Sequence, residues 1–198
     1  LVVATGNKST SVLHADTLKP VVDLKITENG VEKSPLTHRV SWSPDGKWIA
    51  ASSGEVWIWD AQTHALKQTP KMPVWGLKWH PDSRQLMGSN GNTEVWDAID
   101  GKKRGEWNAG SFGWSPDGSE VVSLVNNQPV FVDPLTGKTI RQAPVIGRTT
   151  AYGVAISPDG KQLVSNRLLW DAETGESVRG LEPVELTWTG ASWAPDGK

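Results

Sequence analysis

The sequence predicts an all-β fold, a β-propeller of five four-stranded blades, and three observations indicate it. A seven-residue phrase returns five times along the chain. A Trp-Asp phrase falls between its copies at the same period. Composition agrees, because 12 Trp accompany 20 Gly and 13 Pro in 198 residues. Large aromatic residues combined with frequent turn residues are typical of many short strands joined by tight turns.

The first phrase ends in a turn of the Ser-Pro-Asp-Gly type. Its copies span residues 40–46, 77–83, 112–118, 154–160 and 191–197. Their prolines step by 37, 35, 42 and 37 residues and are Pro44, Pro81, Pro116, Pro158 and Pro195. Proline presets φ and glycine accepts the left-handed conformation, so each copy predicts an apolar strand that runs into a tight turn.

The Trp-Asp phrase, which becomes Val-Asp in one unit, marks the end of the third strand. Its aspartates step by 37, 36 and 38 residues and are Asp60, Asp97, Asp133 and Asp171. Two interleaved markers on a period near ~40 residues are the signature of propeller blades. Alternation along the first strand places one large residue of each unit on the same face, which we predict to be core. These residues are Trp42, Trp79, Trp114, Ile156 and Trp193.

The two ends of the chain are complementary, which predicts a closed ring. Residues 191–198 supply a first strand and its turn, whereas residues 1–6 read as a second strand without a first. Pairing the two removes two exposed sheet edges. The expected blades are blade 1 (1–27 plus 187–198), blade 2 (38–70), blade 3 (74–108), blade 4 (110–143) and blade 5 (151–183).

An open arc is the alternative to this ring. The five units would then be part of a seven- or eight-bladed propeller, and partner chains would meet the free ends as strand-swapped oligomers. The matching ends favour a closed monomer. Residues 24–37 are longer than the corresponding stretch of the other units, and Asn29-Gly30 predicts a small hairpin there.

These phrases resemble those of the WD-repeat (WD40-like) family, in particular bacterial Trp-rich propellers with degenerate repeats. The resemblance covers essentially the whole chain. Two features depart from the family: the Gly-His pair before the first strand is absent, and so is the aspartate between the second and third strands. Gly54-Glu55, Gly91-Asn92 and Asn126-Asn127 occupy those turns instead. The resemblance implies a platform for protein–protein contact, usually one module of a larger polypeptide.

Composition and motifs argue against several function classes. The chain has 20 Lys and Arg but 22 Asp and Glu, so it lacks the excess of positive charge that nucleic-acid binding requires. No apolar run approaches the ~20 residues that cross a bilayer, and without a signal-like segment the cytoplasm is the favoured compartment. Nine carboxylates belong to the repeated turns and are expected to be structural. The four histidines lack metal-ligand spacing, so we expect no cofactor, no metal and no enzyme activity.

The units differ most where their first strands begin, and we predict a binding face there. Aromatic and arginine side chains, the types enriched at interaction hot spots, gather at these positions. The candidate residues are His38, Arg39, Trp75, Arg148, Tyr152 and Trp188. The predicted function is therefore a non-catalytic scaffold that binds a protein or peptide on one face. Two alternatives remain open: a lectin-like propeller, and a structural or engineered repeat protein without a ligand.

Overall fold

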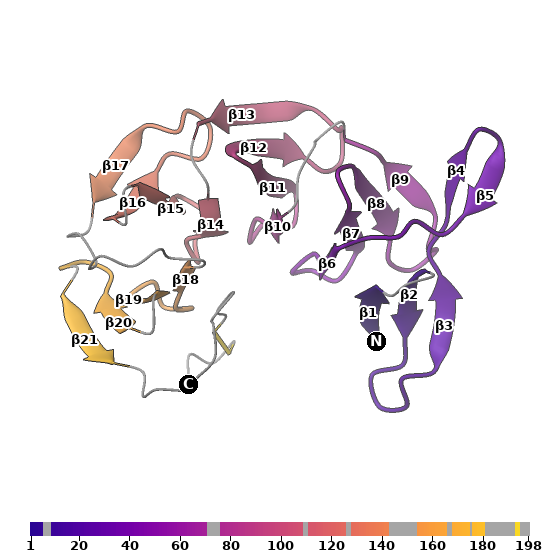
Figure 1. Ribbon diagram of the computed structural model, residues 1–198, viewed down its shortest axis with the longest axis horizontal. Helices are drawn as coiled ribbons and strands as arrows, with labels where there is room; N and C mark the ends of the chain where they lie inside the picture. The colour runs from indigo at the N-terminus through magenta and orange to yellow at the C-terminus, as the bar shows by residue number, and fades with distance from the viewer. Residues whose placement is uncertain are drawn as a thin grey trace. The chain divides into compact units, whose positions relative to one another are not determined.

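The computed structural model of the chain describes residues 1–5, 9–70, 76–108, 111–125, 128–142, 154–165, 168–174, 176–180 and 193–194. All of its secondary structure in these ranges is β-strand (Figure 1). None of these residues belongs to a helix able to cross a membrane. The chain divides into two compact units, residues 1–90 with 94–104 and residues 91–93 with 105–198.

The first unit begins with a three-stranded sheet. Its strands are β1 (Val2–Thr5), β2 (Thr10–Leu13) and β3 (Pro20–Asp23). A two-stranded hairpin follows, formed by β4 (Ile26–Glu28) and β5 (Val31–Lys33). The next sheet has four antiparallel strands in chain order, β6 (Arg39–Trp42), β7 (Trp48–Ser52), β8 (Val56–Asp60) and β9 (Leu66–Gln68).

Three further sheets repeat this four-stranded meander. The first of them, most of which belongs to the first unit, contains β10 (Gly76–Trp79), β11 (Gln85–Asn90), β12 (Asn92–Asp97) and β13 (Lys103–Trp107). The next contains β14 (Ser111–Trp114), β15 (Val121–Val125), β16 (Gln128–Val132) and β17 (Thr139–Gln142). The last contains β18 (Val154–Ile156), β19 (Gln162–Ser165), β20 (Leu168–Asp171) and β21 (Ser177–Gly180).

The predicted all-β fold with four-stranded antiparallel sheets is confirmed. The five-blade count and the closed ring stay predictions. The closing strand was expected within residues 187–198, of which only residues 193–194 are among those described.

The repeated phrase forms the turn that its residues predict. Ser43 Oγ donates to Asp45 Oδ1 at 2.6 Å, and the same carboxylate oxygen accepts the Lys47 N–H at 3.0 Å. Gly46 takes a φ of 72°, which glycine adopts without strain. Ser83 stands at the corresponding position of the next sheet with a φ of 63°. Its Oγ accepts the backbone N–H of Asp45 at 2.9 Å, which connects the two turns.

Apolar side chains fill the space between neighbouring sheets. In the first unit β10 lies against β6 and β7, and the buried cluster there includes Ile58, Trp79 and Leu86. Trp59 is completely buried, and its indole N–H donates to the Lys25 carbonyl oxygen at 2.7 Å. Burying one such tryptophan contributes about 2–3 kcal/mol. The repeated tryptophans Trp79 and Trp114 are buried as predicted, whereas Trp42 is half-buried.

The repeated tryptophans also connect sheets through hydrogen bonds. The indole N–H of Trp79 reaches the Ser41 carbonyl oxygen on β6, and that of Trp193 reaches the Ala155 carbonyl oxygen on β18, each at 3.2 Å. Both bonds span 38 residues. The indole nitrogen of Trp42 is buried but has no partner among the described residues.

The extra residues before β6 form the predicted hairpin. Asn29 and Gly30 have φ values of 51° and 77°, the positive pair that a two-residue type I′ turn requires. The base of the hairpin is held to β2, because Thr10 Oγ1 donates to the Pro35 carbonyl oxygen at 2.9 Å and the Thr10 N–H donates to Ser34 Oγ at 3.1 Å. These bonds fix the base of the hairpin beside the sheet β1–β3.

Candidate binding site

A groove of about 960 Å³ lies between the hairpin β4–β5 and the sheet β6–β9, entirely within the first unit. Figure 1 shows the hairpin extending away from the sheets on both sides of it. The hairpin lines the groove with Ile26, Glu28 and Lys33, and the sheet lines it with Glu55, Trp57 and Leu66. We call this feature the hairpin groove.

Trp57 and Glu55 give the hairpin groove its chemical character. Glu55 immediately precedes β8 and Trp57 is the second residue of that strand, and both side chains line the groove. Trp57 is half-buried and packs against the cluster that contains Ile26, whereas Glu55 is exposed. Within the described part of the chain, neither the Glu55 carboxylate nor the Trp57 indole N–H has a hydrogen-bond or ion-pair partner. Both groups are available to a ligand.

The charges of the hairpin groove do not cancel. Lys33 forms an ion pair with Glu28 across the hairpin. Both side chains are about half exposed, so this pair contributes little to stability, but it places the lysine charge next to Glu28. Glu55 remains as the lining carboxylate without a cation, and the groove therefore carries an uncompensated negative charge.

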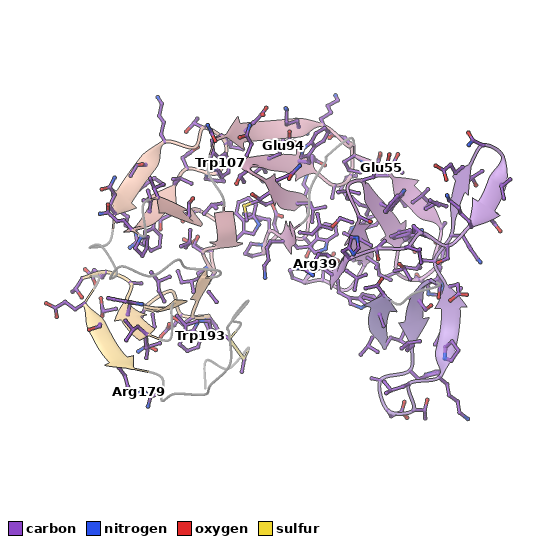
Figure 2. The ribbon with its side chains drawn as sticks, in the orientation of Figure 1. Arg39, Glu55, Glu94, Trp107, Arg179 and Trp193 are labelled. Atoms are coloured by element: carbon purple, nitrogen blue, oxygen red, sulfur yellow. The ribbon has the colours of Figure 1, made fainter. Side chains whose placement is uncertain are left out.

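The hairpin groove lies at the end of its sheet where the first strand begins. Arg39 pairs with Ser52, and Ser52 pairs with Val56, so the starts of β6 and β8 share one end of the sheet. His38 is held there by its N–H, which donates to the Ser52 carbonyl oxygen at 2.8 Å. Figure 2 labels both Arg39 and Glu55 on this sheet.

The structure describes two of the six predicted binding residues, and their role in binding stays a prediction. His38 and Arg39 are exposed at the start of β6, and Arg39 Nη1 donates to the His38 carbonyl oxygen at 3.2 Å. The other four, Trp75, Arg148, Tyr152 and Trp188, lie outside the described residues.

The aspartates of the Trp-Asp phrase cap turns. Asp60 Oδ1 accepts the Thr63 N–H at 2.7 Å and the Gln62 N–H at 3.0 Å. The hydrogen bonds from the Thr63 N–H and hydroxyl lower the pKa of Asp60. Asp133 and Asp171 make the same pair of backbone bonds. These carboxylates stabilise one turn in each of the four four-stranded sheets, which is the structural role that repetition predicts.

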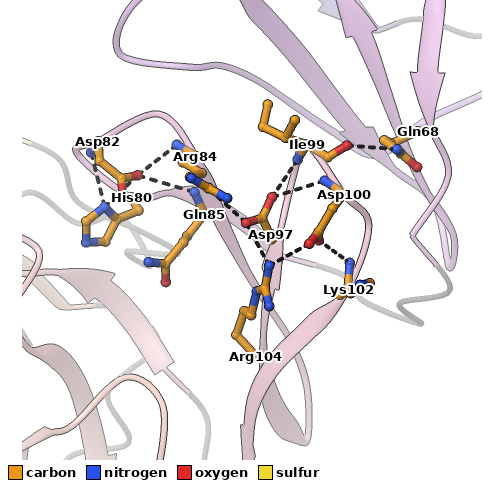
Figure 3. A network of polar contacts seen from close by, with 10 residues as sticks. All are labelled: Gln68, His80, Asp82, Arg84, Gln85, Asp97, Ile99, Asp100, Lys102 and Arg104. Atoms are coloured by element: carbon orange, nitrogen blue, oxygen red, sulfur yellow. Dashed lines mark hydrogen bonds and ion pairs between the residues drawn. The ribbon is translucent and has the colours of Figure 1, made fainter.

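Asp97 is the most heavily bonded of these aspartates (Figure 3). Its side chain is 4% exposed and accepts hydrogen bonds from Arg84 Nε at 2.9 Å and Arg104 Nη2 at 3.1 Å. Burial alone would raise the pKa of Asp97, but hydrogen bonds from the Asp100 N–H, Arg84, the Ile99 N–H and Arg104 lower it to about 2. The network is completed within the sheet. In the described ranges no cluster of three or more His, Asp or Glu side chains is arranged to hold a metal ion.

Comparison with known proteins identifies the repeat. Residues 33–60 and 62–97 match the family model described as WD domain, G-beta repeat. These two stretches are WD repeats. Proteins built from WD repeats are generally non-catalytic and mediate protein interactions, and an all-β, propeller-like fold is the architecture expected of them. No curated protein sequence matches this chain.

Solved structures agree with these WD repeats at the level of the fold. The chain is similar to a chain of Kuenenia stuttgartiensis hydrazine synthase, with a TM-score of 0.60 and 20% identity over 72% of this chain and 48% of that one. It thus spans about half the length of that relative. At this identity the likeness shows the fold alone. Because 1085 chains of solved structures match, the architecture is widespread and does not specify a function.

Sequence reasoning on the WD repeats missed the hairpin groove and its two central residues. One available signal was Trp57, the first tryptophan in Val-Trp-Ile-Trp-Asp, because the corresponding positions of the other units hold Glu94, Val130 and Leu168. The other signal was the length of residues 24–37. Together these two local departures mark the place where one blade differs from the rest.

Proposed function

We propose that this chain is a non-catalytic WD-repeat propeller module that binds a protein partner at the end of the sheets where the first strands begin. The hairpin groove supports this proposal most directly. It combines an unpaired carboxylate, Glu55, with a half-buried aromatic ring, Trp57, at the same sheet end as His38 and Arg39. In the described sheets the repeated aspartates are engaged in turns, so recognition of a partner falls to the residues that differ between the units.

We further propose that the five sheets close into a ring, in which the strand around Ser192-Trp193 adds to β1. Among the described residues, the first sheet has three strands, whereas the four sheets that begin with β6, β10, β14 and β18 have four each. In addition, β10 packs against the first and second strands of the preceding sheet, β6 and β7, and β18 packs in the same way against β14 and β15. The corresponding strand β6 packs against β1, which takes the position of a second strand. A first strand beside β1 would complete the pattern.

The buried indole nitrogen of Trp42 supports the same ring. The indole N–H of Trp79 donates to the carbonyl oxygen of Ser41, the residue before Trp42 in the previous sheet. That of Trp193 donates to the carbonyl oxygen of Ala155, the residue before Ile156. In the proposed ring the sheet before Trp42 contains Trp193, so the expected acceptor for the Trp42 indole N–H is the carbonyl oxygen of the residue before it, Ser192. The proposed strand would therefore satisfy a buried donor, which is costly to leave unpaired.

The ring extends the binding face beyond the first unit. In a closed propeller, all first strands begin on one face, so Trp75, Arg148, Tyr152 and Trp188 would join His38 and Arg39 there. Aromatic and arginine side chains on such a face supply the anchors that dominate interaction energies.

The test is quantitative binding of a native partner. Chemical crosslinking in the source cells identifies the partner, and calorimetry measures its affinity for the purified chain. Changing Arg39, Trp75 and Tyr152 together to alanine should weaken binding at least about tenfold. The matched control replaces Lys47 and Lys161, which are exposed in turns at the opposite ends of their sheets, and should leave the affinity unchanged. Equal affinity of the triple variant and the parent would refute the proposed face.

A further inference from the structure

The contents of the hairpin groove point to a particular kind of ligand. We infer that the groove binds an extended peptide segment of the partner protein, and that a Lys or Arg side chain of this segment lies over Trp57 with its charge paired to Glu55. This inference rests on the proposed function and specifies the chemistry of the partner.

The spacing of Glu55 and Trp57 suits one cationic side chain. Two residues along the chain span at most roughly 7 Å, and both Glu55 and Trp57 line the groove. A cation within about 6 Å of an indole ring is attracted by the ring, and a neighbouring carboxylate adds an ion pair. One ammonium or guanidinium group can contact both side chains at this spacing.

The second unit contains the same combination in an occupied form. The guanidinium of Arg141 lies 3.4 Å from the centroid of the Phe131 ring. Arg141 Nη2 also donates to the Glu120 carboxylate at 2.9 Å. There the chain supplies its own cation to an aromatic ring and a carboxylate. In the hairpin groove the lining lysine, Lys33, is paired with Glu28 instead, which leaves the position beside Glu55 and Trp57 to a cation of the ligand.

The remaining walls of the groove favour an extended peptide over a free ammonium compound. Leu36 and Leu66 line the groove and are 56% and 36% exposed, so they offer apolar contacts to residues beside the cation. In the described sheet β9 pairs with β8 alone, and its outer edge is open to an added strand. Backbone hydrogen bonds along such an edge are a common way to bind extended peptides.

The probe is a set of three acetylated and amidated pentapeptides that differ at the central position, Ser-Val-X-Val-Ser with Lys, norleucine or Glu as X. Binding to the intact, ¹⁵N-labelled chain is followed at the indole N–H resonance of Trp57, which the Trp57→Phe variant assigns. We expect the Lys peptide to shift this resonance and to bind about fivefold or more tightly than the norleucine peptide. The Glu peptide should bind most weakly.

Two matched variants test the role of the carboxylate. Glu55→Gln should abolish the preference for Lys over norleucine, since it removes the charge and retains the shape. Glu32→Gln should keep the preference, because Glu32 is exposed on β5 and lies outside the groove lining. An undiminished preference in Glu55→Gln, or the absence of any preference in the parent, would overturn the inference.

Two further results separate this inference from its rivals and from the proposed function. If cellopentaose shifts the Trp57 resonance while no peptide does, the groove binds carbohydrate and the inference is wrong. If the native partner depends on Arg39, Trp75 and Tyr152 but leaves the Trp57 resonance unmoved, the inference fails and the proposed face stands. The opposite result is a preference for the Lys peptide that requires Glu55, with an affinity for the native partner that the triple alanine variant does not change. It would support peptide binding in the hairpin groove and refute the proposed binding face.

Discussion

The indole N–H of Trp79 donates a hydrogen bond of 3.2 Å to the carbonyl oxygen of Ser41. Ser41 lies on β6, the first strand of the preceding sheet, 38 residues earlier. Trp79 itself is buried in the apolar cluster between the two sheets. One residue of the repeated phrase thus fills the core and ties its sheet to the previous one. The repeat therefore specifies how neighbouring sheets pack as well as how each strand begins and ends.

The hydrogen bond from Trp79 to Ser41 should contribute measurably to the free energy of unfolding. Trp79→Phe keeps a large ring but removes the donor and leaves the Ser41 carbonyl without it, so we expect the free energy of unfolding to fall by about 1–2 kcal/mol. Urea denaturation followed by circular dichroism measures it. Trp57→Phe is the matched control, because the Trp57 indole N–H has no partner in the described structure. Equal losses in the two variants would contradict the proposed contribution of the hydrogen bond.

The Asp97 network predicts a dependence of stability on pH. Its pKa is lowered from 3.8 to about 2 in the folded chain, so the ionised carboxylate stabilises the fold at pH values above 3.8. This contribution, roughly 2 kcal/mol, is lost as the pH falls from 3.8 through 2. Asp97→Asn should be less stable than the parent at pH 7, and the difference should shrink toward pH 2.

Urea titrations at pH 7, 4 and 2.5 compare Asp97→Asn with the parent, and Glu32→Gln serves as an exposed control. A difference that stays constant over this range would show that ionisation of Asp97 does not stabilise the fold.

Ser83 combines an unfavourable backbone conformation with a useful hydrogen bond. Its φ is 63°, where corresponding positions hold glycine, and its Oγ accepts the Asp45 N–H. Ser83→Ala loses the bond and keeps the strained φ, whereas Ser83→Gly loses the bond but relieves the strain. We expect the alanine variant to be less stable than the glycine variant by about 1 kcal/mol in urea denaturation. The reverse order would show that the turn tolerates a side chain without strain.

Arg141 links two sheets of the second unit. It stacks on Phe131, pairs with Glu120, and its Nη1 donates to the Ala172 carbonyl oxygen at 2.7 Å. A lysine cannot make these contacts together, so Arg141→Lys should lower the free energy of unfolding by about 1–2 kcal/mol.

The control is Arg179→Lys on the exposed strand β21, labelled in Figure 2, which should cost little. In a double-mutant cycle, Glu120→Gln and Arg141→Lys should be non-additive. Additive effects would mean that the two side chains do not act as a pair.

The strands and turns were predictable because their determinants are local. The turn around Asp45 needs only Ser43 two residues before it and a glycine after it, and the hairpin needs only Asn29 and Gly30. The hairpin groove was not predictable, because the hairpin is held by Thr10 of β2, which bonds to Pro35 from 25 residues away in the sequence. Asp97 is similar: Arg84 and Arg104 reach it from 13 and 7 residues away through the register of three strands.

The proposed binding face requires the five sheets to form a ring, and cysteine crosslinking tests that ring most directly. The chain has no cysteine of its own, so Val3→Cys and Ser192→Cys introduce the only pair. Directly paired residues of neighbouring strands are close enough for a disulfide. Mild oxidation at low protein concentration should therefore give an intramolecular disulfide in the monomer, identified by mass spectrometry. Finding only intermolecular disulfides, or none, would contradict the closed five-bladed ring.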